Sequence, residues 1–301
     1  MAKGFTNVKV LKGGIEGWKE AGYPLIPSKA LNESNLNLKT FANLHLFDLT
    51  NNRYETLDEV IPELNKSRII IIGEQHDHKS HHIFQLQIIK ALHDSHRRIA
   101  IGLEMFKSES QDALDQWVSG EMTEKNFRKI YYDNWNLPIS LYMMIFEFAK
   151  EAKIPLVGLN VPNSITFNVA KSGFQSLQKE EKEKLKNIRC DVGPKYKSYI
   201  KRAYGSHAHD NFNFTYFCEA QLVWDTIMAV NALKYLENNP GTLLVVLSGV
   251  GHASKWGIPE QLRKRSAVSC KVILPYIPGF IEPNSAAITY TDYIIMPESK
   301  Q

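Results

Sequence analysis

The stretch RIIIIGEQHDHKSHH, residues 68–82, decides the fold predicted for this chain. Its four consecutive isoleucines run into Gly73, and a continuous β-branched run of this kind predicts a strand buried on both faces, in the middle of a parallel sheet. Three ionisable side chains, Glu74, His76 and Asp77, lie within the next four positions. Because open α/β folds bind their ligands at the carboxyl ends of their strands, the stretch also predicts a polar site.

Strand and helix patterns alternate along most of the chain. The segments expected as strands are 46–49, 68–72, 99–103, 154–159, 243–247 and 271–274. This alternation predicts an α/β fold with a mainly parallel sheet and flanking helices. The interval between the strands at 154–159 and 243–247 is longer than one crossover helix needs, so we expect an inserted helical lobe, over about 106–150 and 163–217.

The composition excludes several classes of protein. The net charge of +4 comes from 36 basic and 32 acidic residues that are interspersed. The chain therefore has no basic stripe that would indicate nucleic acid as a partner. Cys190, Cys218 and Cys270 lie far apart, without the spacing of a disulfide framework or a zinc site. No apolar run is long enough for a membrane span, and no export signal follows Met1.

Four expected strands end in a residue that suits a functional site. Glu74 and His76 follow the first, Glu104 the second, Asn160 the third and His252 the fourth. In a parallel sheet these side chains converge on one crevice. They could bind a divalent metal such as Mn, Fe, Co or Zn, or a histidine could act as a general base without a metal.

The neighbouring histidines receive a structural interpretation. His78, His81 and His82 fall at the first turn of the expected helix, where we expect them to face solvent. A charged imidazole at that position would also oppose the helix dipole.

The first residues differ in character from the rest of the chain. GFTNVKVLKGGIEGWKEAGYPLIP, from Gly4 onward, resembles the closing segment of a rhodanese-like domain. We interpret residues 1–27 as a remnant of such a domain, or as part of a chain whose start lies upstream. Residues 28–43 are expected as a linker, 44–290 as the α/β domain with its lobe, and 291–301 as a tail.

Four motifs support a resemblance to a family. GEQHD with its following histidines, GLEMF, FCEAQLVWDTIMA at 217–229 and SGVGHASKWGIPEQLRKR at 248–265 together resemble the ChaN family of haem-binding proteins. That family lies within the Tiki superfamily, with distant kinship to erythromycin esterases and Tiki metalloproteases. The resemblance implies an α/β core with a helical lobe and a role in haem or iron acquisition at the cell envelope, in the periplasm of a bacterium.

The same resemblance assigns residues to a site. Those relatives use Glu and His at the strand ends for hydrolysis. Glu74, His76, Glu104 and His252 match that set, and Glu219, Gln221 and Asp225 fall on the helix motif that accompanies it, with Asp77 and Asn160 as further supporting residues.

For haem, the resemblance implies a tyrosine ligand, a histidine nearby and a homodimer around the haem. The segment 196–217 is the best candidate, with Tyr199, Tyr204, His207 and His209. Lys201 and Arg202 could meet the haem propionates; Tyr142 is a further candidate ligand. Alternatively, the aromatic residues of this segment form the core of the lobe.

Two functions from different classes follow from the sequence. The first is a haem-binding protein of the ChaN type, active in haem or iron acquisition. The second is a hydrolase, an esterase or peptidase, that uses the cluster at the strand ends with or without a metal. The resemblance favours haem binding, whereas the residues taken alone favour the hydrolase.

Overall fold

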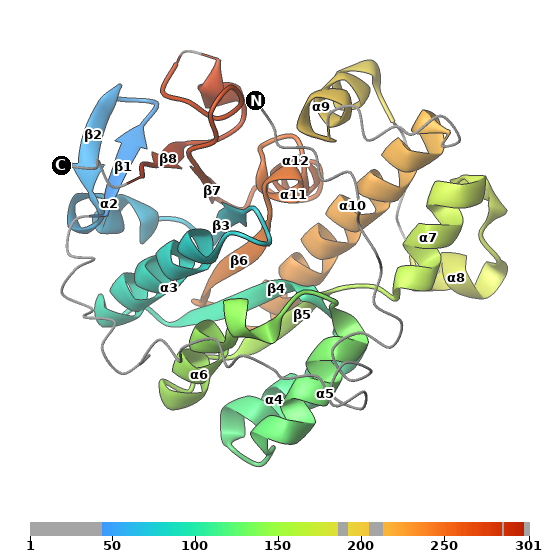
Figure 1. The fold of residues 1–301 in the computed structure, drawn as a ribbon, viewed down its shortest axis with the longest axis horizontal. Coiled ribbons are helices and arrows are strands. Elements are labelled where there is room, and N and C mark those ends of the chain that lie inside the picture. The colour runs from blue at the N-terminus through green and yellow to red at the C-terminus, as the bar shows by residue number, and fades with distance from the viewer. Residues whose placement is uncertain (1–43, 186–191, 205–212, 285, 298–301) are drawn as a thin grey trace, which may run out of the picture. The chain divides into compact units, whose positions relative to one another are not determined.

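The computed structural model describes residues 44–185, 192–204, 213–284 and 286–297, without the side chains at 184 and 202–204. These residues form an eight-stranded sheet in the order β2-β1-β8-β7-β3-β6-β4-β5, with helices on both faces (Figure 1). The strands are β1 (His45–Asp48), β2 (Arg53–Thr56), β3 (Ile69–Glu74), β4 (Ile99–Lys107), β5 (Leu156–Asn160), β6 (Leu243–Gly249), β7 (Cys270–Pro275) and β8 (Tyr293–Ile295). All neighbours from β8 to β5 run parallel, and only β1 and β2 add antiparallel pairs. The α/β fold class with a mainly parallel sheet is confirmed.

The helices that carry the argument below belong to the crossovers between the strands. They are α2 (Leu57–Leu64), α3 (Lys79–Asp94), α4 (Gln111–Ser119), α5 (Glu124–Asn134), α6 (Met143–Glu151), α7 (Asn163–Ser172), α8 (Lys179–Lys184), α9 (Pro194–Tyr204), α10 (Phe214–Asn238), α11 (Val250–Ala253) and α12 (Ile258–Arg263). Within the described ranges, no helix combines the length and the apolar character that crossing a membrane requires.

The isoleucine run forms the centre of the sheet, as predicted. β3 lies between β6 and β7, and all four isoleucines are fully buried. Ile69 and Ile71 pack into the core shared with α7, α9, α10 and α12. Ile70 and Ile72 pack into the opposite core, shared with α2 to α6. The alternation of side chains along a strand therefore explains why an unbroken apolar run was needed here.

The inserted helices lie in the two expected intervals. α4, α5 and α6 connect β4 to β5, and α7, α8 and α9 precede the long helix α10 that leads to β6. The first group has an aromatic core, in which the ring of Phe127 lies 4.2 Å from Trp117 and 5.3 Å from Phe146 between centroids. α4, α5 and α6 add buried side chains to the core on one face of the sheet, and α7 and α9 add them to the core on the other face.

One predicted segment differs from the structure, and two lie outside the described residues. The expected tail, 291–301, contains β8, which pairs with β7 and β1. A three-residue strand is too short to give a periodic pattern, and its pairing depends on distant strands on both sides. Residues 1–27 and 28–43 lie outside the described residues, so the rhodanese-like remnant and the linker stay predictions.

Candidate functional site

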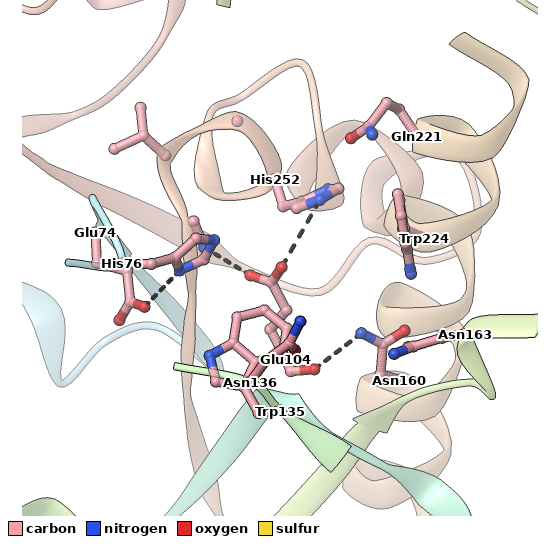
Figure 2. Close-up of a pocket in the computed structure, with 13 residues that line it drawn as sticks. Glu74, His76, Glu104, Trp135, Asn136, Asn160, Asn163, Gln221, Trp224 and His252 are labelled. Atoms are coloured by element: carbon pink, nitrogen blue, oxygen red, sulfur yellow. Dashed lines mark hydrogen bonds and ion pairs between the residues drawn. The ribbon is translucent and has the colours of Figure 1, made fainter. Parts of the chain in front are cut away.

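The structure brings the polar residues at the strand ends to one pocket of about 390 Å³. β3, β4, β5 and β6 each end at this pocket, and α10 closes it from the side (Figure 2). It is lined by Glu74, His76, Glu104, Trp135, Asn136, Asn160, Asn163, Gln221, Trp224, Gly249, Val250, Gly251 and His252. The volume lies in the range of small-molecule sites.

Glu74 is the most heavily bonded carboxylate of the site. Its Oε1 lies 2.8 Å from His76 Nδ1 and also accepts the hydroxyl proton of Tyr142. Its Oε2 accepts from Gln85 Nε2 at 2.7 Å and lies 3.3 Å from His82 Nδ1. Burial raises the pKa of Glu74, but its contacts with the two histidines outweigh burial and lower that pKa below its usual value. Glu74 is therefore a buried anion that orients its neighbours.

His76 contacts Glu74 through Nδ1 of its imidazole. Burial lowers the pKa of His76, but the hydrogen bond to Glu74 and the negative charge of Glu104 outweigh it and raise the pKa to about 9. The ring of Trp135 meets the imidazole edge-on at 5.2 Å between centroids. A Cβ at Gly249 would lie 2.9 Å from two atoms of the imidazole ring, so only glycine leaves room for His76. At neutral pH this imidazole is a cation.

Glu104 is held at a β-bulge. The register between β4 and β5 shifts between Leu103 and Lys107, and Asn160 Nδ2 donates to the backbone oxygen of Glu104 at 2.9 Å. Bulges often re-aim a side chain beside a site. Here the carboxylate turns toward β6, where Glu104 Oε2 accepts from the backbone nitrogen of Gly249 at 2.6 Å.

His252 is held by a carboxylate from the other side of the pocket. Its Nδ1 lies 2.6 Å from Asp225 Oδ1, and the other carboxylate oxygen, Oδ2, accepts from the hydroxyl of Tyr196 at 2.5 Å. Burial lowers the pKa of His252, but the charges of Glu104 and Asp225 outweigh it, and the pKa is raised. The pKa of Asp225 is raised by burial. Nδ1 is occupied, so Nε2 is the atom that can exchange a proton in the pocket.

One position in the pocket lies within reach of both His252 and Glu104. His252 Nε2 and Glu104 Oε1 are 3.8 Å apart, too far for a direct hydrogen bond (Figure 2). An oxygen atom of a ligand or a water between them could contact both. His76 supplies a positive charge on the other side of Glu104. These groups provide a proton acceptor, a carboxylate and a cation around one small space.

The metal interpretation lacks a ligand set in the described ranges. No group of three or more His, Cys, Asp or Glu side chains there is arranged to hold an ion. The geometry gives the reason: both oxygens of Glu74 and Nδ1 of His252 already have protein partners. The described residues therefore do not support a divalent metal at this site.

The predicted exposure of the histidines that follow Asp77 is wrong for two of them. His78 is exposed, but His81 and His82 are buried. His82 contacts Glu74, and its Nε2 lies 2.9 Å from the backbone oxygen of His76. His81 Nδ1 accepts from the backbone nitrogen of Gln75 at 3.0 Å. α3 packs its first turn onto the end of β3, and this tertiary contact decided the burial.

The supporting residues have different positions. Gln221 lines the pocket, and Asp225 holds His252. Asp77 is exposed and does not line the pocket. Glu219 Oε2 accepts from the backbone nitrogen of Phe174 at 2.7 Å, which ties α10 to the end of α7. The helix motif at 217–229 therefore divides between the pocket and the packing of the lobe.

Two of the haem-ligand candidates do not suit that role. Tyr142 and Tyr199 are buried, and their hydroxyls donate to Glu74 and to the backbone oxygen of Gly251. Burial raises the pKa of both tyrosines, whereas an iron ligand would have to lose its proton. The side chain of Tyr204, and His207 and His209 entirely, lie outside the described residues.

Sequence reasoning missed several residues that line the pocket: Trp135, Asn136, Asn163 and Trp224. Trp224 had a usable signal, because Gln221, Trp224 and Asp225 follow the spacing of one helix face. Asn163 begins α7 directly after β5 and had none.

Comparisons with known proteins find one family and several solved structures that resemble this chain. The family model for haem-binding uptake proteins of the Tiki superfamily, ChaN, matches residues 60–262. Among solved structures, ChaN of Campylobacter jejuni, described with cofacial haem binding, has a TM-score of 0.65 and 20% identity, over 84% of this chain and 96% of that one. The erythromycin esterase EreC, a variant in its open conformation, has a TM-score of 0.50 and 13% identity, over 77% of this chain and 76% of that one.

At these identities the two solved structures show a shared fold and no more. The search of curated proteins gives no match. The family model, in contrast, spans β3, β4, β5 and β6 with all the strand-end residues described above. The chain therefore belongs to the ChaN family of haem-binding uptake proteins in the Tiki superfamily.

Proposed function

We propose that this protein binds ferric haem in haem uptake at the bacterial cell envelope. The observation that carries the proposal is the family match over residues 60–262. The ChaN structure from Campylobacter jejuni, which has the same fold, is described with cofacial haem binding. Cofacial haems between two copies of the chain would agree with the predicted homodimer.

The strand-end pocket does not suit haem. Glu74, Glu104 and Asp225 place three carboxylates in or next to it, and haem carries two propionate groups of the same sign. Helix α9 suits those groups better, because Lys195 and Lys201 are exposed and its sequence has no acidic residue. We therefore place the haem site at α9 and the residues after it.

The tyrosine ligand is chosen among the tyrosines of α9 by the state of their hydroxyls. Tyr196 and Tyr199 of α9 are buried, with hydroxyls that donate to Asp225 and Gly251. Tyr204, at the end of the helix, is the ligand we propose, with His207 or His209 beside it. An anionic oxygen ligand stabilises ferric iron, which suits a carrier of oxidised haem.

A haem titration tests this proposal. Purified protein mixed with ferric haem should show a saturable shift of the Soret band, which Tyr204→Phe should abolish. Tyr142→Phe is the matched control and should keep the shift. A free-haem spectrum at stoichiometric protein would reject haem binding, and a wild-type spectrum from Tyr204→Phe would reject the ligand. The mass of the protein with and without haem, measured by light scattering, tests the dimer.

A second function, hydrolysis of an ester or amide, is supported by the Asp225–His252 pair. The imidazole is held at Nδ1 by a buried carboxylate and presents Nε2 to the pocket. In the reaction we propose, Nε2 takes a proton from water, the water oxygen attacks the carbonyl carbon, and the His76 cation stabilises the negative oxygen that forms. His252 then returns the proton to the leaving group as the carbon–oxygen or carbon–nitrogen bond breaks.

Para-nitrophenyl esters and a peptide mixture are suitable first substrates. The wild type should hydrolyse at least one of them, and His252→Ala should remove that activity. His78→Ala, at an exposed histidine outside the pocket, should keep it. Equal rates for wild type and His252→Ala would reject the hydrolase.

A further inference from the structure

Two residues of the pocket, Trp135 and Gln221, have a buried side-chain atom without a hydrogen-bond partner among the described residues. The second of them, Gln221, has an unpaired acceptor. The side chain is 4% exposed and lines the pocket from α10. Its Oε1 is buried and has no hydrogen-bond partner among the described residues. Figure 2 shows the carboxamide on the pocket side of α10, next to His252. A buried amide oxygen without a donor is unfavourable, and a ligand with a hydroxyl or N–H group would satisfy it.

The charges around the pocket restrict what that ligand can be. Glu74, Glu104 and the adjacent Asp225 contribute carboxylates, while His76 and His252 are the only possible cations among the residues that line the pocket. In the part of the chain that the structure describes, neither lysine nor arginine lines the pocket. A phosphate or carboxylate ligand would therefore find no surplus of positive charge, and a neutral ligand fits better.

Two indoles add apolar walls to these polar groups. Trp135, after α5, meets His76 edge-on at 5.2 Å between centroids. Trp224, on α10, meets His252 edge-on at 5.9 Å. Both tryptophans are partly exposed, so part of each ring is open to a ligand. Asn136 and Asn163 add carboxamides at the same pocket. Aromatic faces beside amide groups suit a ring that has apolar C–H faces and a rim of hydroxyls.

We propose that the pocket binds a neutral sugar ring, the hexose unit of a glycan or glycoside, with one hydroxyl donating to Gln221 Oε1. This inference rests on the proposed hydrolytic site, since it names the class of substrate that reaches His252. The hydroxyls supply donors to Gln221 and to Glu104, and the C–H faces of the ring pack on the indoles. Gln221 is then a residue that determines specificity and takes no part in the bond cleavage.

The test measures binding without turnover, in protein that carries His252→Ala. Saturation-transfer NMR is recorded with glucose, galactose and N-acetylglucosamine as probes, and with glucuronate as the anionic comparison. At least one neutral sugar should bind, and more tightly than glucuronate. Gln221→Leu should weaken that binding roughly three- to tenfold, the range for loss of one hydrogen bond. The matched control Gln116→Leu, at an exposed position of α4, should change nothing.

A second variant separates recognition from a folding defect. Gln221→Glu keeps an acceptor oxygen at the same place and should retain sugar binding, with thermal unfolding of each variant as the check on folding. The proposal is overturned if no neutral sugar binds, if glucuronate binds as well as the neutral sugars, or if Gln221→Leu binds like its parent. Sugar binding without ester or peptide hydrolysis would overturn the hydrolase and support the pocket as a sugar-binding site alone. The Soret titration is independent of both.

Discussion

The strand side and the helix side of the pocket are built in different ways. On the strand side, Glu74 and Glu104 are held by neighbours in the sheet and by the first turn of α3. On the helix side, Asp225 and the backbone of Gly251 are held by two tyrosine hydroxyls from α9. The strand side therefore depends on the core of the fold, whereas the helix side depends on one helix of the lobe.

This difference changes the interpretation of α9. From the sequence, the strand-end cluster was assigned to hydrolysis and the segment 196–217 to haem. Tyr196 and Tyr199 instead connect them, because both belong to α9 and both bond to the pocket. α9 ends at Tyr204, directly before the histidines proposed to lie beside haem. α9 therefore joins the strand-end pocket to the segment proposed for haem.

The largest effect is expected on the strand side, from Glu74→Ala. The substitution leaves Tyr142 and Gln85 without their acceptor and removes the charge that faces two imidazoles. Breaking a buried charged network of this kind costs about 3–5 kcal/mol in the free energy of unfolding. Chemical denaturation measures the loss. The control Glu63→Ala removes an exposed pair with Lys66 and should cost less than about 1 kcal/mol.

Gly249→Ala tests the close contact between β6 and His76. The new Cβ would lie 2.9 Å from the imidazole, so the ring must move away from Glu74. Overpacking of this kind costs about 1–3 kcal/mol. Thermal unfolding gives the cost, and the NMR shifts of His76 report its displacement. Unchanged shifts would show that the ring has more room than the structure gives it.

The sheet could be predicted because its signals are local. An unbroken isoleucine run between Arg68 and Gly73 has few interpretations other than a central strand, and glycine-bounded apolar segments repeat at Ile99 and Leu243. Convergence of Glu74, Glu104 and His252 then followed from the parallel arrangement alone. β8 was missed because three residues carry no period.

The partners of the site could not be predicted, since they come from contacts between distant parts of the chain. Tyr142 was a candidate haem ligand in the sequence, yet its hydroxyl donates to Glu74, which is 68 residues away along the chain. His82 and Gln85 share one face of α3, but only the packing of that helix on β3 turns the face toward Glu74. The packing of α9 on α10 brings the Tyr196 hydroxyl to Asp225. Helix periodicity could group residues on a face but could not say what the face contacts.

On the helix side, Tyr196→Phe is expected to cost about 1–2 kcal/mol. The substitution removes the donor to Asp225 Oδ2 and leaves a buried carboxylate oxygen unpaired. Tyr54→Phe, at an exposed tyrosine, should stay within about 0.5 kcal/mol of the wild type. If α9 holds the Asp225–His252 pair in place, the cost should shrink in a His252→Ala background, and a double-mutant cycle measures that coupling. If the costs of Tyr196→Phe and His252→Ala in the free energy of unfolding simply add, Tyr196 is not coupled to His252.

The smallest effect is a dependence of stability on pH that comes from His76. The folded pKa of about 9 lies above the value of roughly 6.5 expected for an unfolded histidine. Folding therefore favours the protonated imidazole, and its stabilising contribution is complete below pH 6.5 or so and disappears as the pH rises through about 9. Since the side chain is 36% exposed, solvent screens the effect. NMR titration of the imidazole gives the pKa directly, and denaturation at pH 6 and pH 9.5 gives the stability difference, which His76→Gln should reduce. A titration midpoint at or below 6.5 would mean that Glu74 and Glu104 do not stabilise the protonated imidazole of His76. The network of charges proposed for the strand side would then be wrong.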